Sequence, residues 1–153
     1  MKFLIDRDIL VTGISTVEKF VPSKSPISIL SGIKFFASKK GLYLSATDLD
    51  MGIEYKIEQI PEKVDIINEG TTVIGAKVLS EILRKIPKGS VSFSQEDNKI
   101  NINSGDFNMV LPCVDAFDFP EITRNDLTPA LEFSQKKFKE MIKQTIFARA
   151  EDS

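Results

Sequence analysis

The stretch TTVIGAKVLSEILRKIPKGSVSFS, residues 71–94, decides the fold that the sequence predicts. Its first residues, TTVIG, are β-branched and end in glycine, which is typical of a strand. The apolar residues that follow recur at the spacing of one helix face: Val78, Leu79, Ile82, Leu83 and Ile86. Pro87 and Gly89 end that helix, and another strand follows at VSFS (91–94).

The same order of elements occurs twice along the chain. Two further strands, KINI (99–102) and FNMVL (107–111), complete a β-α-β-β-β unit. The first half of the chain has matching elements: a strand at 3–5, an amphipathic helix capped by Asp6, and strands at 28–37, 42–47 and 51–60. The sequence therefore predicts an α+β domain built from two such units.

A third copy of the pattern starts after the second unit. The apolar residues Phe3, Ile5, Leu10 and Ile14 are matched at a constant offset by Leu131, Phe133, Phe138 and Ile142. The segment between the copies is acidic and contains Pro120 and Pro129, as a linker would. We expect a domain at 1–120, a linker at 121–130, and the first strand and helix of a truncated second domain at 131–153. The chain is then expected to be a piece of a longer protein.

Composition narrows the possible chemistry. The sequence has no histidine, which excludes Ser-His-Asp and Cys-His catalysis and zinc sites with histidine ligands within this chain. Its single cysteine, Cys113, forms no intramolecular disulfide and fits a reducing compartment, so a cytoplasmic location is expected. The charged N-terminus is unlike a secretory signal, and no apolar run is long enough to span a membrane.

The net charge of −2 hides two basic segments. Residues 77–88 carry four basic side chains against Glu81, and residues 136–149 carry five against Glu140. Acidic residues dominate 95–126 instead. This distribution can present a positive face to a polyanion while the remaining surface stays negative.

The stretch ATDLDMGIEYKI (46–57) holds the arrangement most like an acid–base or metal site. Asp48 and Asp50 are one residue apart, and Glu54 follows, so a carboxylate-dependent metal enzyme is one hypothesis. However, side chains one residue apart on a strand point to opposite faces, and aspartate is a preferred turn residue. We therefore favour the corner of a β-hairpin at Asp48 and Asp50.

Short motifs in a fixed order resemble the bacterial DNA polymerase III beta subunit family, the sliding clamps. The matching stretches are MKFLIDRDIL (1–10), PISIL (26–30), TDLDM (47–51), ILRKIP (82–87), SG (104–105), FP (119–120) and FSQKKFKEMIKQTIFA (133–148). The resemblance implies the DNA clamp fold, with helices on one face of antiparallel sheets. It also implies a processivity factor without catalytic residues, metal or cofactor. Two protomers of that family associate head to tail around duplex DNA and tether the replicative polymerase.

The resemblance also assigns roles to individual residues. It implies sequence-independent DNA contacts by Lys24, Lys77 and Arg84, where Lys24 stands at a position at which the family tends to have arginine. Taken alone, the apolar spacing of Ile82 and Ile86 and the placement of Met109 and Leu111 on one strand face favour core packing. The resemblance implies protomer contacts by Ile82, Ile86, Met109 and Leu111 instead, which should form an exposed apolar patch in an isolated first domain. DNA polymerase III and the clamp loader would bind through domains that this sequence largely lacks.

Two other classes of function stay open from the residues alone. One is the metal enzyme that uses Asp48, Asp50 and Glu54. Tight binding of Mg²⁺ or Mn²⁺ would support it. The other is a β-rich protein-interaction domain with no role on DNA. The absence of salt-dependent DNA binding would support it.

Overall fold

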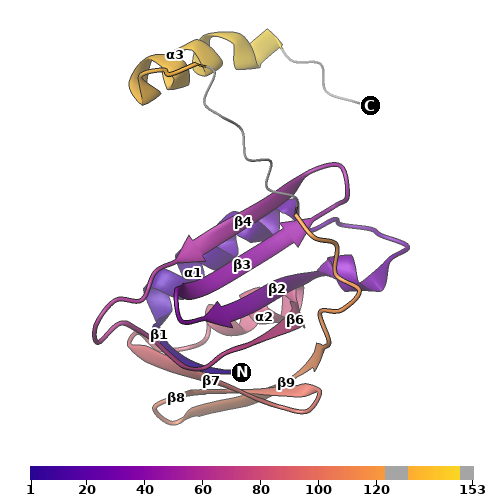
Figure 1. Cartoon of the computed structure of the whole chain (residues 1–153), viewed down its shortest axis with the longest axis vertical. Coiled ribbons are helices and arrows are strands. Elements are labelled where there is room, and N and C mark those ends of the chain that lie inside the picture. Colours follow the sequence, from indigo (N-terminus) through magenta and orange to yellow (C-terminus); the bar gives the residue numbers. More distant parts are fainter. Residues whose placement is uncertain (123–130, 149–153) are drawn as a thin grey trace. The chain divides into compact units, whose positions relative to one another are not determined.

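The structure is a computed structural model that describes residues 1–122 and 131–148 (Figure 1). The chain separates into two compact units, Met1–Ile122 and Thr123–Ser153. Most of the expected linker, at 123–130, and the last residues, 149–153, lie outside the described residues.

The first unit carries two α-helices and nine strands among its described residues. In the first half they are β1 (Lys2–Asp6), α1 (Arg7–Val17), β2 (Gly32–Ser38), β3 (Gly41–Thr47), β4 (Gly52–Ile57) and β5 (Val64–Asn68), with the 3-10 helices η1 (Glu18–Phe20) and η2 (Ser28–Ser31). In the second half they are β6 (Gly70–Gly75), α2 (Ala76–Leu83), β7 (Ser90–Glu96), β8 (Lys99–Ser104) and β9 (Phe107–Val114).

The expected β-α-β-β-β order is thus confirmed in both halves, with one strand more than predicted. The predicted strand at 51–60 ends at Ile57, and the chain turns at Pro61 before β5 begins. In that turn the Lys63 N–H donates to the Ile60 carbonyl at 3.0 Å, and Glu62 has a φ of 64°. The pattern missed β5 because VDIIN is short and alternates only from Val64 to Ile66.

The two halves exchange their first strands. The strands of the unit lie in the antiparallel order β4-β3-β2-β6-β9-β8-β7-β1-β5. Strand β1 of the first repeat pairs with β7 of the second, and β6 of the second pairs with β2 of the first. Neither repeat can therefore complete its sheet without the other.

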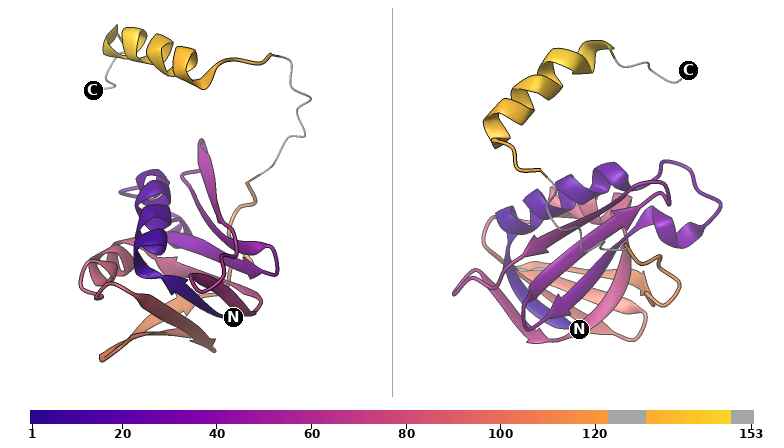
Figure 2. Two further views of the ribbon diagram at one scale, coloured as in Figure 1. Left: turned by 90° about the vertical axis from the view of Figure 1, so that its left-hand side faces the viewer. Right: turned by 45° about the horizontal axis from the view of Figure 1, so that its top comes forward.

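Both helices of the first unit cover the same side of this sheet (Figure 2). The core lies between the helices and the strands, and Phe3, Phe35 and Phe93 from three different strands stack at its centre. The Phe3 and Phe93 ring centroids are 4.9 Å apart, and the Phe35 and Phe93 centroids are 6.2 Å apart. Aromatic stacking at this spacing adds to the free energy gained by burial.

One predicted strand is partly wrong. Residues 28–31 of the predicted strand 28–37 form η2, and β2 begins only at Gly32. Serine side chains explain the difference, because they bond to nearby backbone groups and favour turns. Ser25 Oγ accepts from the Ile27 N–H at 3.1 Å, and Ser31 Oγ donates to the Ser28 carbonyl at 2.6 Å.

Among the described residues, the second unit carries one α-helix, α3 (Gln135–Thr145), followed by the 3-10 helix η3 (Ile146–Ala148). The predicted helix of the third copy is therefore confirmed. The predicted strand is not, because residues 131–134 have no secondary structure. A strand needs a neighbour to pair with, and the described part of this unit offers none. The Phe133 and Phe138 rings stack instead, with centroids 5.8 Å apart.

Candidate nucleic-acid interface

The outer face of α2 carries basic side chains. Its buried residues include Leu79, Ile82 and Leu83, and the opposite face is exposed. Lys77 and Glu81 lie on that face within the helix, and Arg84 follows at its C-cap; all three are exposed. Lys88 is exposed in the loop between α2 and β7. No ion pair within residues 1–122 neutralises Lys77 or Arg84. The face therefore keeps a positive charge.

Arg7 joins the two helices and was not singled out by the sequence. Its Nη2 donates to the carbonyl oxygen of Leu83, at the C-terminus of α2, at 3.1 Å. A positive charge is favourable at this helix end, where carbonyl groups lack helical partners. The Arg7 N–H also donates to the Gly89 carbonyl at 2.9 Å. No sequence signal marks this contact, because its partners are far apart along the chain.

We expect Arg7→Ala to lower the free energy of unfolding by about 1–2 kcal/mol, because a charged hydrogen bond at the end of α2 is lost. Urea denaturation would measure the change. Lys19→Ala, which removes an exposed basic side chain of η1, is the control and should be nearly neutral. Equal stability of the two variants would show that Arg7 does not hold α2.

Asp8 lies beside this junction, and its negative charge partly offsets the positive charge of Arg7. Arg7 Nη1 donates to Asp8 Oδ1 at 2.8 Å, and this hydrogen bond lowers the pKa of Asp8, with a further contribution from the nearby Lys88. Because the pKa is lowered, the pair is present at neutral pH and is lost as the pH falls through the lowered pKa. An acidic group thus stands next to the basic face of α2.

Lys24, the third predicted DNA contact, does not lie on α2. Lys24 is exposed in the loop between η1 and η2, whereas Lys77 lies on α2 and Arg84 at its C-cap. The helix of the second unit also carries a basic face of its own, with Lys136, Lys137, Lys139 and Lys143 all exposed.

Three of the four residues expected to form an exposed apolar patch are buried, whereas their contact with a second protomer stays a prediction. Only Met109 is substantially exposed, at 38%, whereas Ile82, Ile86 and Leu111 are 7%, 3% and 5% exposed and belong to the main core. Because α2 contacts α1, β2 and β6, its apolar residues other than the half-exposed Val78 face protein.

The hairpin corner at Asp48 and Asp50 is confirmed. It joins β3 to β4, and Asp48 Oδ1 accepts from the Met51 N–H at 2.7 Å and from the Asp50 N–H at 3.1 Å. The Asp48 carboxylate is thus used to hold the turn. Within the described residues, no three histidine, cysteine or acidic side chains gather as metal ligands.

Leu49, at the same corner, has a φ of 83°, which is unfavourable for a residue with a Cβ atom. We expect Leu49→Gly to raise the free energy of unfolding by about 1 kcal/mol, because the backbone strain is relieved and the lost side chain is exposed. Leu49→Ala removes the same side chain and keeps the strain, so it should not stabilise. Thermal unfolding of both variants tests this, and a stabilising alanine would contradict the explanation.

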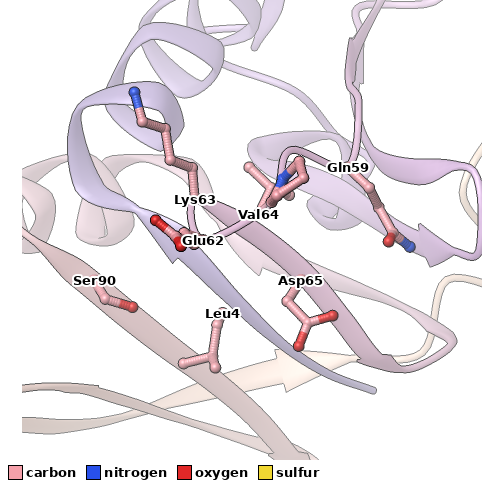
Figure 3. Close-up of a pocket in the computed structure, with 8 residues that line it drawn as sticks. Leu4, Gln59, Glu62, Lys63, Val64, Asp65 and Ser90 are labelled. Carbon is pink, nitrogen blue, oxygen red and sulfur yellow. The ribbon is translucent and has the colours of Figure 1, made fainter.

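A shallow pocket near β5 offers no convergent chemistry (Figure 3). Its walls come from β1, the β4–β5 turn, β5 and β7, and they include Leu4, Glu62, Asp65 and Ser90. Within residues 1–122, no ion pair joins the charged side chains that line it.

Among the described residues, the helices are too short and too polar to span a membrane.

Known proteins of one family are similar to this chain. The model of the family described as DNA polymerase III beta subunit, N-terminal domain, matches residues 1–123. The beta sliding clamp of Halalkalibacterium halodurans is 35% identical over 152 residues, covering 97% of this chain and 40% of the relative. The beta sliding clamp of Bacillus subtilis is 34% identical over the same shares of the two chains.

Solved structures of sliding clamps are also similar to this chain. The crystal structure of the DNA polymerase sliding clamp from Bacillus subtilis superposes with a TM-score of 0.89 at 32% identity, over 96% of this chain and 40% of that chain. The structure of Caulobacter crescentus pol III beta gives 0.87 at 32% identity, over 100% and 40%. The chain thus spans about 40% of the length of the relatives it matches. It belongs to the DNA polymerase III beta subunit family, whose N-terminal domain it carries in residues 1–123.

Proposed function

We propose that this chain supplies the first domain of a DNA sliding clamp, a non-catalytic processivity factor that encircles duplex DNA. Membership of the family and the names of the relatives support this proposal. The structural observation that carries it is the exposed basic face of α2, on which no ion pair in residues 1–122 neutralises Lys77 or Arg84. Such a face attracts phosphates without reading bases.

Lys24, Lys77 and Arg84 are the proposed DNA contacts. Each is exposed, and each can approach a phosphate as a flexible positive charge. Asp8 keeps the basic density beside α2 modest, which suits a protein that must slide rather than hold one position. Binding is then weak, independent of base sequence and sensitive to salt.

The proposed assembly is a head-to-tail pair of full-length protomers. Met109 is the proposed contact residue of this chain because it is exposed, whereas Ile82, Ile86 and Leu111 are buried in the core. DNA polymerase III and the clamp loader are proposed to bind through other parts of the full-length protein. A cytoplasmic location is proposed because the sequence has a single cysteine.

Charge reversal on α2 tests the DNA contact. Lys77→Glu and Arg84→Glu should each weaken binding to two unrelated duplexes by the same factor and lower the slope of log affinity against log salt by about 1 or more. Fluorescence anisotropy with labelled duplexes measures both quantities. Lys99→Glu on β8 makes the same charge change at an exposed position away from the helices. Equal loss in Lys99→Glu would mean that net charge alone, and not the α2 face, attracts DNA.

A further inference from the structure

An apolar groove lies on the first unit where η2 meets the ends of β6 and β9. It has a volume of about 620 Å³, within the range of ligand sites, and its walls include Ile27, Val73 and Val114. Ile27 and Val114 expose much of their side chains to solvent. We call this the Gly75 groove, after the residue at the end of β6 that also lines it.

Two glycines shape the groove in opposite ways. A Cβ atom on Gly32 would collide with Val73 Cγ1, so this glycine lets the start of β2 lie close to the Val73 side chain on β6. A Cβ atom on Gly75 would meet nothing within 4 Å, and its φ of −55° is open to any residue. The absence of a side chain at Gly75 therefore leaves space in the groove without being required by the backbone.

The charged residues described at the groove are acidic. Among the described residues that line it, the charged ones are Asp115 and Asp118, both exposed on the loop after β9. Asp115 Oδ1 accepts from the Phe117 N–H at 2.8 Å, which fixes this loop, and Phe119 anchors it in a small cluster with Val73. No ion pair within the described residues neutralises either carboxylate.

Between the two carboxylates, Phe117 projects into solvent with 91% of its surface exposed. Exposed aromatic side chains beside apolar pockets are enriched at protein interfaces, where they bury a large area. Phe117 serves no packing role in the first unit, since Phe119 already holds the loop. The loop that supplies the two carboxylates of the groove thus also carries an exposed aromatic side chain.

We propose that the Gly75 groove binds a peptide segment of a partner protein that combines aliphatic side chains with lysine or arginine. The aliphatic groups would occupy the apolar walls, and the basic groups would pair with Asp115 and Asp118. The same carboxylates repel nucleic acid and acidic peptides, so this surface is separate in chemistry from the basic face of α2. The proposal does not depend on the chain acting as a clamp.

The test uses the whole chain and a short fluorescein-labelled peptide of leucine, alanine and lysine, with a matched peptide in which glutamate replaces lysine. The lysine peptide should bind and shift the methyl resonances of Ile27 and Val114, while the glutamate peptide should not. Gly75→Leu fills the groove and Asp118→Lys reverses its charge, and each should weaken binding by about tenfold or more. Asp65→Lys on β5 is the charge control and should bind as the unmodified chain does.

Several results would overturn the proposal. Equal binding of both peptides, or an equal loss of binding in Asp65→Lys, would show that the attraction is not specific to the groove. Retained affinity in both Gly75→Leu and Asp118→Lys, with melting temperatures near that of the unmodified chain, would place the peptide elsewhere. Concentration-dependent self-association that shifts the Val114 resonance and disappears in Gly75→Leu would make the groove a contact between two copies instead. DNA binding of Gly75→Leu, which changes no charge, should be unchanged, which separates this proposal from the clamp function.

Discussion

Replacing Phe93 by alanine is expected to lower the free energy of unfolding by about 3–5 kcal/mol. Phe93 is fully buried, and its ring stacks on Phe3 from β1 and lies against Phe35 from β2. Because β1 belongs to one repeat and β7 to the other, the cavity would open at the place where the two repeats are joined. Much of a small domain's stability would be lost.

Phe117→Ala is the matched control for this change. It removes the same atoms from a side chain that is exposed, so its effect should stay within roughly 0.5 kcal/mol. Urea denaturation followed by circular dichroism would measure both variants. A loss below about 1 kcal/mol for Phe93→Ala would contradict the stacked core described above.

Ile82→Asp is expected to destabilise the chain by about 3–5 kcal/mol, because it would bury a carboxylate without a partner. Ile82 is part of the main core, and α2 is held there by contacts with α1, β2 and β6. An interface residue exposed in the isolated domain would instead tolerate the change. The experiment therefore separates burial within this domain from burial against a second protomer.

Val78→Asp controls for the position on the helix. Val78 precedes Ile82 by about one turn and is exposed, so the same charge there should cost little. If thermal unfolding showed that both variants lose similar stability, the effect would come from an acidic residue anywhere on α2. It would then not come from the burial of Ile82. If Ile82→Asp were as stable as the unmodified chain, the position of Ile82 in the core would be wrong.

Features decided by neighbouring residues could be predicted from the sequence. The cap of α1 follows from Asp6, whose carboxylate accepts from the Asp8 N–H at 2.9 Å and from the Ile9 N–H at 3.3 Å. The hairpin corner follows from aspartate between two strand patterns. The basic face of α2 follows from helical spacing, since Lys77 and Arg84 fall opposite the apolar residues.

Features decided by distant contacts could not be predicted in this way. Strand β5 pairs with β1, which lies far away in the sequence, and its own residues alternate only from Val64 to Ile66. The burial of both Ile82 and Leu83 depends on protein around α2 on more than one side. The role of Arg7 at the end of α2 depends on the packing of two helices, which no local pattern encodes.

The salt dependence of DNA binding tests the proposed clamp function most directly. The affinity of the chain for two duplexes of unrelated sequence would be measured by fluorescence anisotropy over a series of salt concentrations. We expect weak binding that is the same for both duplexes and falls linearly on a logarithmic scale as salt rises, because phosphate contacts release counterions. A preference for one duplex that persists at high salt, or no salt-dependent binding at all, would contradict the account.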